Sequence, residues 1–210
     1  MKQIKSEIIK YAKMLNSKKL SALRSGNISI KYKNGFFITP SGKKYSTLKN
    51  SDIVYVGLDG IFDKNYGVPS SEWKFHQDIY LKKKEANAIV HAHSTNATAI
   101  SAHKKGIPAF HYMVAMAGGK DIKCAKYATF GTRALSKNIL VALKNRNACL
   151  ISNHGQIAFE KNLSKAFELA EEVENISLQY ITSLKLGKPK ILSLNEMKKV
   201  LSKAKNYKKG

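Results

Sequence analysis

The chain has 210 residues, 43% of them hydrophobic, which is enough to bury the core of a single domain spanning 1–210. Its formal net charge is +23, but only three of the 37 basic residues are Arg and the lysines are scattered, which argues against a nucleic-acid partner. No apolar run is long enough to span a bilayer, the N-terminal residues lack the apolar stretch of a signal peptide, and there are only two cysteines, so we expect a cytoplasmic protein with reduced thiols.

The first quarter of the chain predicts one helix followed by strands. Apolar residues at helical spacing predict an amphipathic helix over 2–23. Short runs rich in β-branched and aromatic residues at 28–32 and 35–38 predict a hairpin, because Asn34-Gly35 between them is a strong turn signal. A further strand is expected at 53–56.

Helices and strands interleave over the rest of the chain, which predicts a layered α/β domain. Ser70-Ser71-Glu72 predicts a helix start with a serine cap and an acidic first turn. The elements expected are helices at 73–84, 97–104, 132–145, 163–186 and 196–205, strands at 86–90, 148–151 and 156–159, a loop at 117–119, and a flexible tail from about 203.

Two histidines one residue apart, His91 and His93, close the short apolar strand at 86–90. Side chains at positions i and i+2 of a strand lie on the same face, so the two imidazoles point the same way. Neutral imidazole is a common metal ligand, and this pair therefore forms half of a possible metal site. By spacing alone, the pair is a weak signal, and hydrogen-bonding roles are the alternative.

Two further side chains are candidates to complete the site. His154 lies at a tight turn between two strands and is followed by Gly155, so its ring can project from a rigid support. Glu72, at a helix start, is the candidate carboxylate for a fourth position beside three histidines. We assign ordinary surface or packing roles to the other histidines, which are His76, His103 and His111.

Three short polar segments have features that suit an anion such as phosphate. Ser70 and Ser71 precede a helix, where free backbone N–H groups and the helix dipole favour negative charge. Gly26-Asn27 and Ser41-Gly42 are small polar turns, and glycine allows the backbone to approach a ligand closely. Together with the metal ligands, they predict a metal-dependent enzyme that acts on a small anionic substrate.

These residues resemble the class II aldolase/adducin family. The resemblance covers nearly the whole chain, and its middle stretches are most like the fuculose-phosphate branch. It is carried by Pro69-Ser70-Ser71-Glu72-Trp73, His91-Ala92-His93, residues 107–113, 127–133 and 142–146, and Asn153-His154-Gly155. It implies an α/β single domain with a central, mostly antiparallel sheet flanked by helices.

The resemblance also implies a function and roles for individual residues. The expected enzyme is a zinc-dependent lyase that cleaves a ketose 1-phosphate, L-fuculose 1-phosphate foremost, to dihydroxyacetone phosphate and L-lactaldehyde. It implies a homotetramer with active sites at subunit interfaces. The implied zinc ligands are His91, His93, His154 and Glu72. The residues implied to transfer protons or close the site are Glu72, Tyr112 of a neighbouring subunit and Tyr207. The implied phosphate pocket consists of Gly26, Asn27, Ser41, Gly42, Ser70 and Ser71.

The chain departs from the family pattern at three positions, Ala92, Asn153 and Ala204, and the last bears on how the tail closes and on preference for the aldehyde. Sibling activities stay open: an aldolase for 5-deoxypentulose 1-phosphates, a pentulose-phosphate 4-epimerase and a methylthioribulose-phosphate dehydratase. Glu72 favours an aldolase, because the epimerase branch carries aspartate there. A non-enzymatic adducin-like module is disfavoured, because all three histidines are present.

Overall fold

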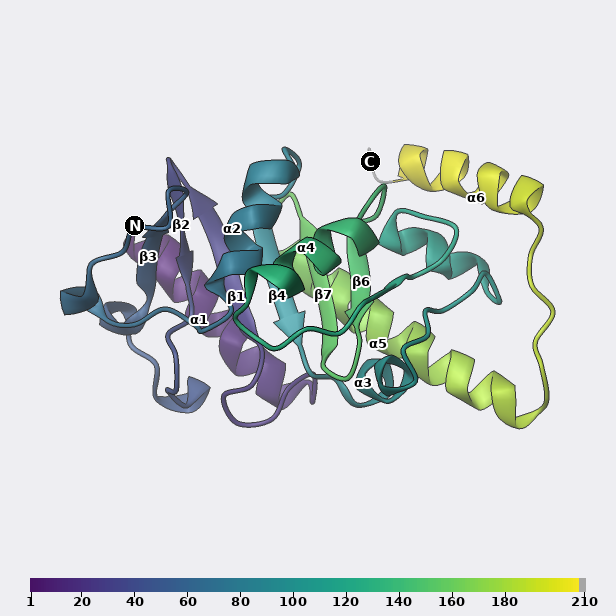
Figure 1. Cartoon of the computed structure of the whole chain (residues 1–210), viewed down its shortest axis with the longest axis horizontal. Coiled ribbons are helices and arrows are strands. Elements are labelled where there is room, and N and C mark those ends of the chain that lie inside the picture. Colours follow the sequence, from purple (N-terminus) through teal and green to yellow (C-terminus); the bar gives the residue numbers. More distant parts are fainter. Residues whose placement is uncertain (208–210) are drawn as a thin grey trace.

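A seven-stranded sheet forms the centre of the molecule (Figure 1). The computed structural model describes the backbone of residues 1–207 and the side chains of residues 1–204. The strand order is β3-β2-β1-β4-β7-β6-β5, and all neighbours are antiparallel except β5 and β6. The strands are β1 (Asn27–Tyr32), β2 (Gly35–Ile38), β3 (Val54–Gly57), β4 (Ala88–Ala92), β5 (Cys124–Ala125), β6 (Ala148–Ile151) and β7 (Gly155–Glu160). The expected fold class, α/β with a mostly antiparallel sheet, is confirmed.

Helices cover both faces of the sheet and create two apolar cores. α1 (Lys2–Ser17), α3 (Thr95–Ala102) and α5 (Leu163–Lys185) pack on one face, and α2 (Trp73–Lys82) and α4 (Arg133–Ala142) on the other. Alternation along β4 supplies both cores, because Val90 and Ala92 join the first and Ile89 joins the second. No helix in the described part of the chain is both long and apolar enough to cross a membrane.

The last helix, α6 (Leu194–Tyr207), lies beyond the β5 edge of the sheet, reached by an extended segment after α5 (Figure 1). It packs on η4, a 3₁₀ helix at Tyr112–Ala117, through a small apolar cluster centred on the buried Met197. The shorter 3₁₀ turns are η1 (Tyr45–Thr47), η2 (Asn50–Asp52) and η3 (Lys64–Tyr66). The expected tail start at about 203 falls within α6, and residues 208–210 of that tail lie outside the described residues.

The first helix ends earlier than its periodicity predicts, at Ser17 and not at residue 23. Lys19 adopts a positive φ of 56°, and the backbone N–H groups of Leu20 and Ser21 donate to the carbonyl of Leu15. This turn reverses the chain and buries Leu20, which is 2% exposed. The apolar residues beyond Ser17 belong to the turn and its packing, which is why they continue the helical pattern.

Other expected elements differ in detail. The expected serine cap of α2 is wrong, because the residue in the capping position is Glu72, whose side chain makes no capping hydrogen bond. Ser70 Oγ instead accepts a hydrogen bond from the Glu72 backbone N–H, at 3.4 Å. The two-residue strand β5 and the 3₁₀ helix η4 were not predicted, because neither segment has a recognisable apolar period. Helix α5 ends as predicted beside Gly187, whose φ is 117°.

A candidate metal centre beside a polar cavity

Three neighbouring strands and one helix start bring the candidate ligands together. β4 lies between β1 and β7, with His91 paired to Asn27 on one side and to Ile157 on the other. His93 follows the end of β4, and His154 lies in the turn that joins β6 to β7. The loop before α2 places Glu72 against these strand ends, so residues from three segments far apart in sequence meet at one end of the central strands.

Two close backbone approaches shape the site. A Cβ added to Gly26 would lie 2.6 Å from the carbonyl oxygen of His91, and its φ of 77° also favours glycine. A Cβ added to Gly155 would lie 2.4 Å from the carbonyl oxygen of Ala92. Because the main chains beside β4 approach so closely, larger residues at these two positions would push the site apart.

The ligand atoms of Glu72, His91, His93 and His154 all lie within 4.8 Å of one another. The Nε2 atoms of His91 and His93 are 3.0 Å apart, and Glu72 places Oε2 3.2 Å from His91 Nε2. Its Oε1 lies 3.3 Å from His154 Nε2. The three imidazole centroids are each 4.8 Å apart with steep interplanar angles, so their nitrogens converge on one point between the rings.

The hydrogen bonds of this cluster fit a divalent cation at its centre. His91 Nδ1 donates to the backbone carbonyl of Gln156 at 2.7 Å, so the neutral His91 ring has its lone pair on Nε2, toward the cluster. Glu72 Oε1 is buried and accepts no hydrogen bond, although His154 Nε2 faces it. Lone pairs of one carboxylate and several imidazoles thus face a common point, and a cation there would satisfy them all.

Electrostatics favour the protonation states that bind metal at Glu72, His93 and His154. Burial opposes ionisation of Glu72, but His91, His154 and Asn27 outweigh it and lower the pKa of its carboxyl to about 2. Burial lowers the pKa of His93 to about 3 and that of His154 to about 4, with the nearby His91 adding to both shifts. Glu72 therefore presents an anionic carboxylate, and His93 and His154 present neutral imidazoles, at neutral pH.

A cavity of about 370 Å³ opens onto the cluster. Glu72, His93 and His154 line it, while His91 is fully buried behind them. The remaining lining side chains are mostly small and polar, and no lysine is among the described residues that line the cavity. The volume suits a small molecule with several hydrogen-bonding groups.

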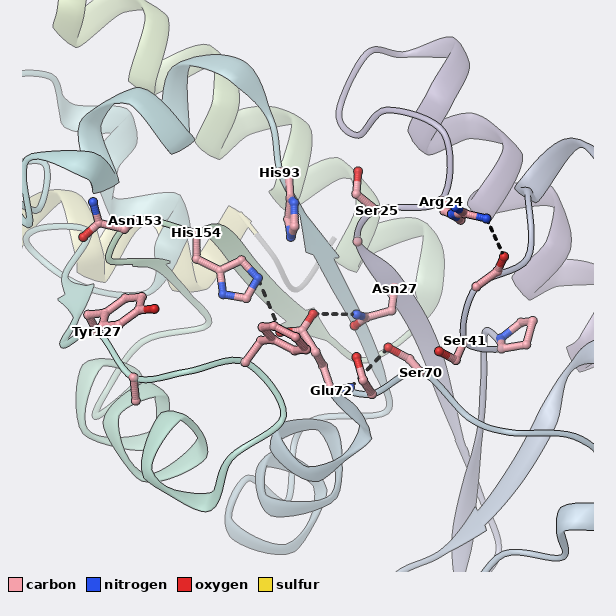
Figure 2. Close-up of a pocket in the computed structure, with 16 residues that line it drawn as sticks. Arg24, Ser25, Asn27, Ser41, Ser70, Glu72, His93, Tyr127, Asn153 and His154 are labelled. Atoms are coloured by element: carbon pink, nitrogen blue, oxygen red, sulfur yellow. Dashed lines mark hydrogen bonds and ion pairs between the residues drawn. The ribbon is translucent and has the colours of Figure 1, made fainter.

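All six residues predicted to bind phosphate line this cavity: Gly26, Asn27, Ser41, Gly42, Ser70 and Ser71. In Figure 2, Ser41 and Ser70 lie on the opposite side of Glu72 from His154. Asn27 is 2% exposed, and its amide nitrogen donates to Glu72 Oε2 at 3.0 Å, so it also contacts the candidate metal ligands. The cavity thus has one end lined by metal-type ligands and one end lined by small polar groups.

Sequence reasoning missed several residues of the cavity. Arg24 lines its polar end, and its Nη1 donates to the carbonyl of Gly42 at 3.0 Å (Figure 2). Tyr127 and Phe130 lie at its rim and are 59% and 64% exposed. The scarcity of arginine and the position of Arg24 two residues before Gly26 were the available signals.

The remaining predicted residues lie elsewhere. Tyr112, 54% exposed, lines a separate apolar cavity between η4 and α6. Tyr207 is the last residue of α6, and its side chain lies outside those described. His103 is exposed and His111 is half-buried. His76 is fully buried and hydrogen-bonded to Asn27 and Ser29, so its role exceeds the ordinary packing role that we expected.

Comparisons with known proteins identify the family of this chain. The family described as Class II Aldolase and Adducin N-terminal domain matches residues 6–181. The chain is 47% identical to an L-fuculose phosphate aldolase of Escherichia coli K12, over 87% of this chain and 85% of that one. It is 42% identical to a 5-methylthioribulose-1-phosphate/5-deoxyribulose-1-phosphate aldolase of Rhodospirillum rubrum, over 95% and 90% of the two chains. A solved L-fuculose 1-phosphate aldolase superposes with a TM-score of 0.94 at 39% identity, covering 98% of this chain and 97% of that chain.

Proposed function

The chain belongs to the class II aldolase/adducin family, and we propose that it is a zinc-dependent aldolase that cleaves L-fuculose 1-phosphate to dihydroxyacetone phosphate and L-lactaldehyde. The observation that carries this proposal is the convergence of three imidazoles and a carboxylate beside a cavity whose other end is small and polar. The identity to curated aldolases over most of the chain supports the lyase activity. The absence of lysine from the described cavity lining speaks against a Schiff-base aldolase.

Four residues are proposed to hold the cation: His91, His93, His154 and Glu72. A bound zinc ion acts as a Lewis acid for the negative charge that develops when the C3–C4 bond of the ketose phosphate breaks. Ser41, Ser70, Ser71, Gly26, Gly42 and Asn27 are proposed to bind the phosphate, and Arg24 adds a cationic group at that end. Binding at both ends orients the reacting carbons beside Glu72.

Glu72 is proposed to be both the fourth ligand and the acid/base group. Its carboxylate is ionised and 6% exposed, so it is a proton acceptor shielded from bulk water. Its oxygens lie beside the cavity, and in cleavage the carboxyl group would first take up a proton from water in the cavity and then donate it to the carbon left when the C3–C4 bond breaks. The buried Oε1, which accepts no hydrogen bond, is the atom available for that step.

The second proton transfer is assigned to a neighbouring subunit. Tyr112 lies on η4 outside the cavity of its own chain, so we propose that it takes the C4 hydroxyl proton at a partner's site within a homotetramer. Tyr207 is proposed to close the site at the same interface.

A cytoplasmic location is proposed as well, supported by Cys124 and Cys149, which are both free thiols.

A second candidate function is the cleavage of 5-deoxyribulose 1-phosphate or its 5-methylthio analogue. The Rhodospirillum rubrum relative, whose name gives these substrates, matches a larger share of this chain than the Escherichia coli enzyme does. Both reactions release dihydroxyacetone phosphate and differ only in the aldehyde, so the same metal and phosphate ends serve both.

A retro-aldol assay on a panel of ketose phosphates tests the proposal. L-fuculose 1-phosphate, 5-deoxyribulose 1-phosphate and 5-methylthioribulose 1-phosphate are compared by the release of dihydroxyacetone phosphate. We expect the highest kcat/KM for L-fuculose 1-phosphate. A higher value for either other ketose supports the second candidate. Release from none of them, with epimerised pentulose phosphate or a dehydrated product instead, contradicts aldolase function.

Removal of the metal extends this assay. Dialysis against a chelator is expected to abolish release of dihydroxyacetone phosphate, and added zinc is expected to restore it. Magnesium added to the same sample serves as the control, because a site of three imidazoles and one carboxylate favours zinc over a hard cation. Full activity in protein shown by elemental analysis to be metal-free contradicts the proposed mechanism.

A further inference from the structure

A buried line of polar side chains runs from the metal cluster into the core between β1 and α2. Asn27 donates through Nδ2 to Glu72 Oε2 at 3.0 Å. The Oδ1 of Asn27 lies 2.5 Å from Nε2 of His76. Nδ1 of His76 lies 2.7 Å from Ser29 Oγ, which is in turn 2.7 Å from the Tyr80 hydroxyl. Five residues thus form one continuous chain of four hydrogen bonds.

The carboxylate at one end fixes the direction of every bond in this chain. An ionised Glu72 can only accept, so Asn27 must present its amide N–H to Glu72 and its carbonyl to His76. His76 must then carry its proton on Nε2 and accept on Nδ1, from Ser29. Ser29 has used its only hydrogen and therefore accepts from Tyr80. A single assignment satisfies all the members.

Packing holds the central link of this chain in place. His76 is fully buried and stacks near-parallel on Phe75 at 4.9 Å and on Phe36 at 6.4 Å between ring centroids. Burial also keeps its ring neutral, since its pKa is lowered to about 3. His76 and Tyr80 are four residues apart on α2, so both face the sheet and reach Ser29 on β1.

We propose that His76 is a positioning residue that acts through Asn27. By donating to the Asn27 carbonyl, it holds the amide N–H toward Glu72 and prevents the amide from turning its oxygen to the carboxylate. Glu72 Oε2 then stays 3.2 Å from His91 Nε2, as cation binding requires. Its effect on turnover rests on the proposed aldolase function, while its effect on metal affinity does not.

The substitutions His76→Phe and His76→Gln separate this role from packing. Phenylalanine keeps the stacking on Phe36 and Phe75 but removes the donor to Asn27, whereas glutamine retains an N–H near the position of Nε2. For His76→Phe we expect zinc affinity, by calorimetric titration, to fall about 10- to 100-fold, and kcat to fall by a similar factor and by more than KM rises. For His76→Gln we expect most of both losses to be recovered.

Two further variants make the test decisive. His103→Phe, the same change at an exposed position, is the matched control and is expected to leave zinc affinity and kinetics unchanged. Ser29→Ala removes the donor to Nδ1 and so frees the ring to change tautomer; it is expected to lower zinc affinity several-fold even if His76→Phe does not fold. All titrations are made on protein that circular dichroism shows to be folded.

The outcomes distinguish failure of this proposal from failure of the proposed function. Folded His76→Phe or Ser29→Ala protein with wild-type zinc affinity and kcat overturns the positioning role and leaves the aldolase proposal standing. Glutamine and phenylalanine variants with equal losses also overturn it, because packing alone would then explain both. A wild-type protein that cleaves no ketose phosphate but binds zinc overturns only the proposed function. A wild-type protein that binds no zinc overturns both.

Discussion

At the residue scale, Glu72 combines two roles that one substitution separates. Glu72→Gln keeps the volume and one oxygen ligand but removes the charge that accepts a proton. We expect kcat for retro-aldol cleavage to fall by about 100-fold or more, while the dissociation constant for the ketose phosphate changes little. Steady-state kinetics and calorimetric titration measure the two quantities.

The control for this change is Glu85→Gln, which removes the same charge from an exposed turn before β4 and is expected to leave kcat unaltered. A turnover number for Glu72→Gln within a factor of two of the wild type would rule out proton transfer by this carboxyl group.

Arg24 should produce the opposite kinetic pattern. It lines the small polar end of the cavity, and its Nη1 donates a hydrogen bond to the Gly42 carbonyl. Its other guanidinium N–H groups can therefore donate to a bound anion. Arg24→Gln is expected to raise KM for the ketose phosphate about 10-fold, with kcat within a factor of two. Lys13→Gln, on α1 away from the cavity, removes the same charge and should leave KM unchanged. Equal changes in KM for both variants would assign the effect to net charge.

The candidate site was predictable from the sequence to the extent that local geometry decides it. Strand alternation places His91 and His93 on one face, and a tight turn followed by Gly155 marks His154. His76 and Arg24 were not predictable in their roles. A histidine within a helix is typical of packing, and only the tertiary fold places the His76 ring against Asn27. The position of Arg24 before Gly26 is a weak local signal, and only the tertiary fold places Arg24 beside the cavity.

At the scale of elements, segments with a strong period or turn signal were predicted well, and segments defined by tertiary contacts were not. The hairpin β1–β2 and helix α5 have such signals and lie where expected. Helix α1 ends six residues early because its chain reversal depends on a positive φ at Lys19, a residue type with no turn preference. Strand β5 exists through its pairing with β6, which no local pattern encodes.

The start of helix α3 depends on a side chain from another helix. Glu174 on α5 accepts hydrogen bonds from the backbone N–H groups of Asn96 and Ala97 and from the Asn96 side chain, at 2.7–2.9 Å. Ser94, the residue in the capping position, makes no side-chain cap bond, so the carboxylate of Glu174 satisfies donors that would otherwise be free.

Glu174→Ala is therefore expected to lower the free energy of unfolding by about 1–3 kcal/mol, measured by urea denaturation. The matched control is Glu168→Ala on the same helix, where an exposed carboxylate pairs with Lys165. Because exposed ion pairs add little, this control is expected to cost at most about 0.5 kcal/mol. A cost for Glu174→Ala no larger than that of the control would show that α3 does not depend on this cap.

At the scale of the whole molecule, the fold brings the candidate metal ligands and the polar cavity together, but it places Tyr112, the proposed second acid/base group, outside that cavity. Tyr112 is the first residue of η4, which packs against α6, and it lines an apolar cavity with Met113, Met116, Val200 and Ala204. Because Tyr112 does not line the cavity of its own chain, its role at the site of a neighbouring subunit, which the sequence resemblance implies, stays a proposal. In the proposed homotetramer, we propose that η4 of one chain lies beside the cavity of the next subunit.

Subunit mixing tests this arrangement directly. Glu72→Gln and Tyr112→Phe chains are each expected to be impaired alone, but a mixed oligomer contains sites that combine the intact Glu72 of one chain with the intact Tyr112 of its neighbour. With random one-to-one mixing, about a quarter of the sites are intact, so activity should recover toward about a quarter of the wild-type value. The matched control mixes Glu72→Gln with His154→Ala; because both residues line one chain's own cavity, no mixed site is intact and no recovery is expected. If oligomers shown by differential tags to be mixed regain nothing in the first experiment, Tyr112 does not serve a neighbouring site.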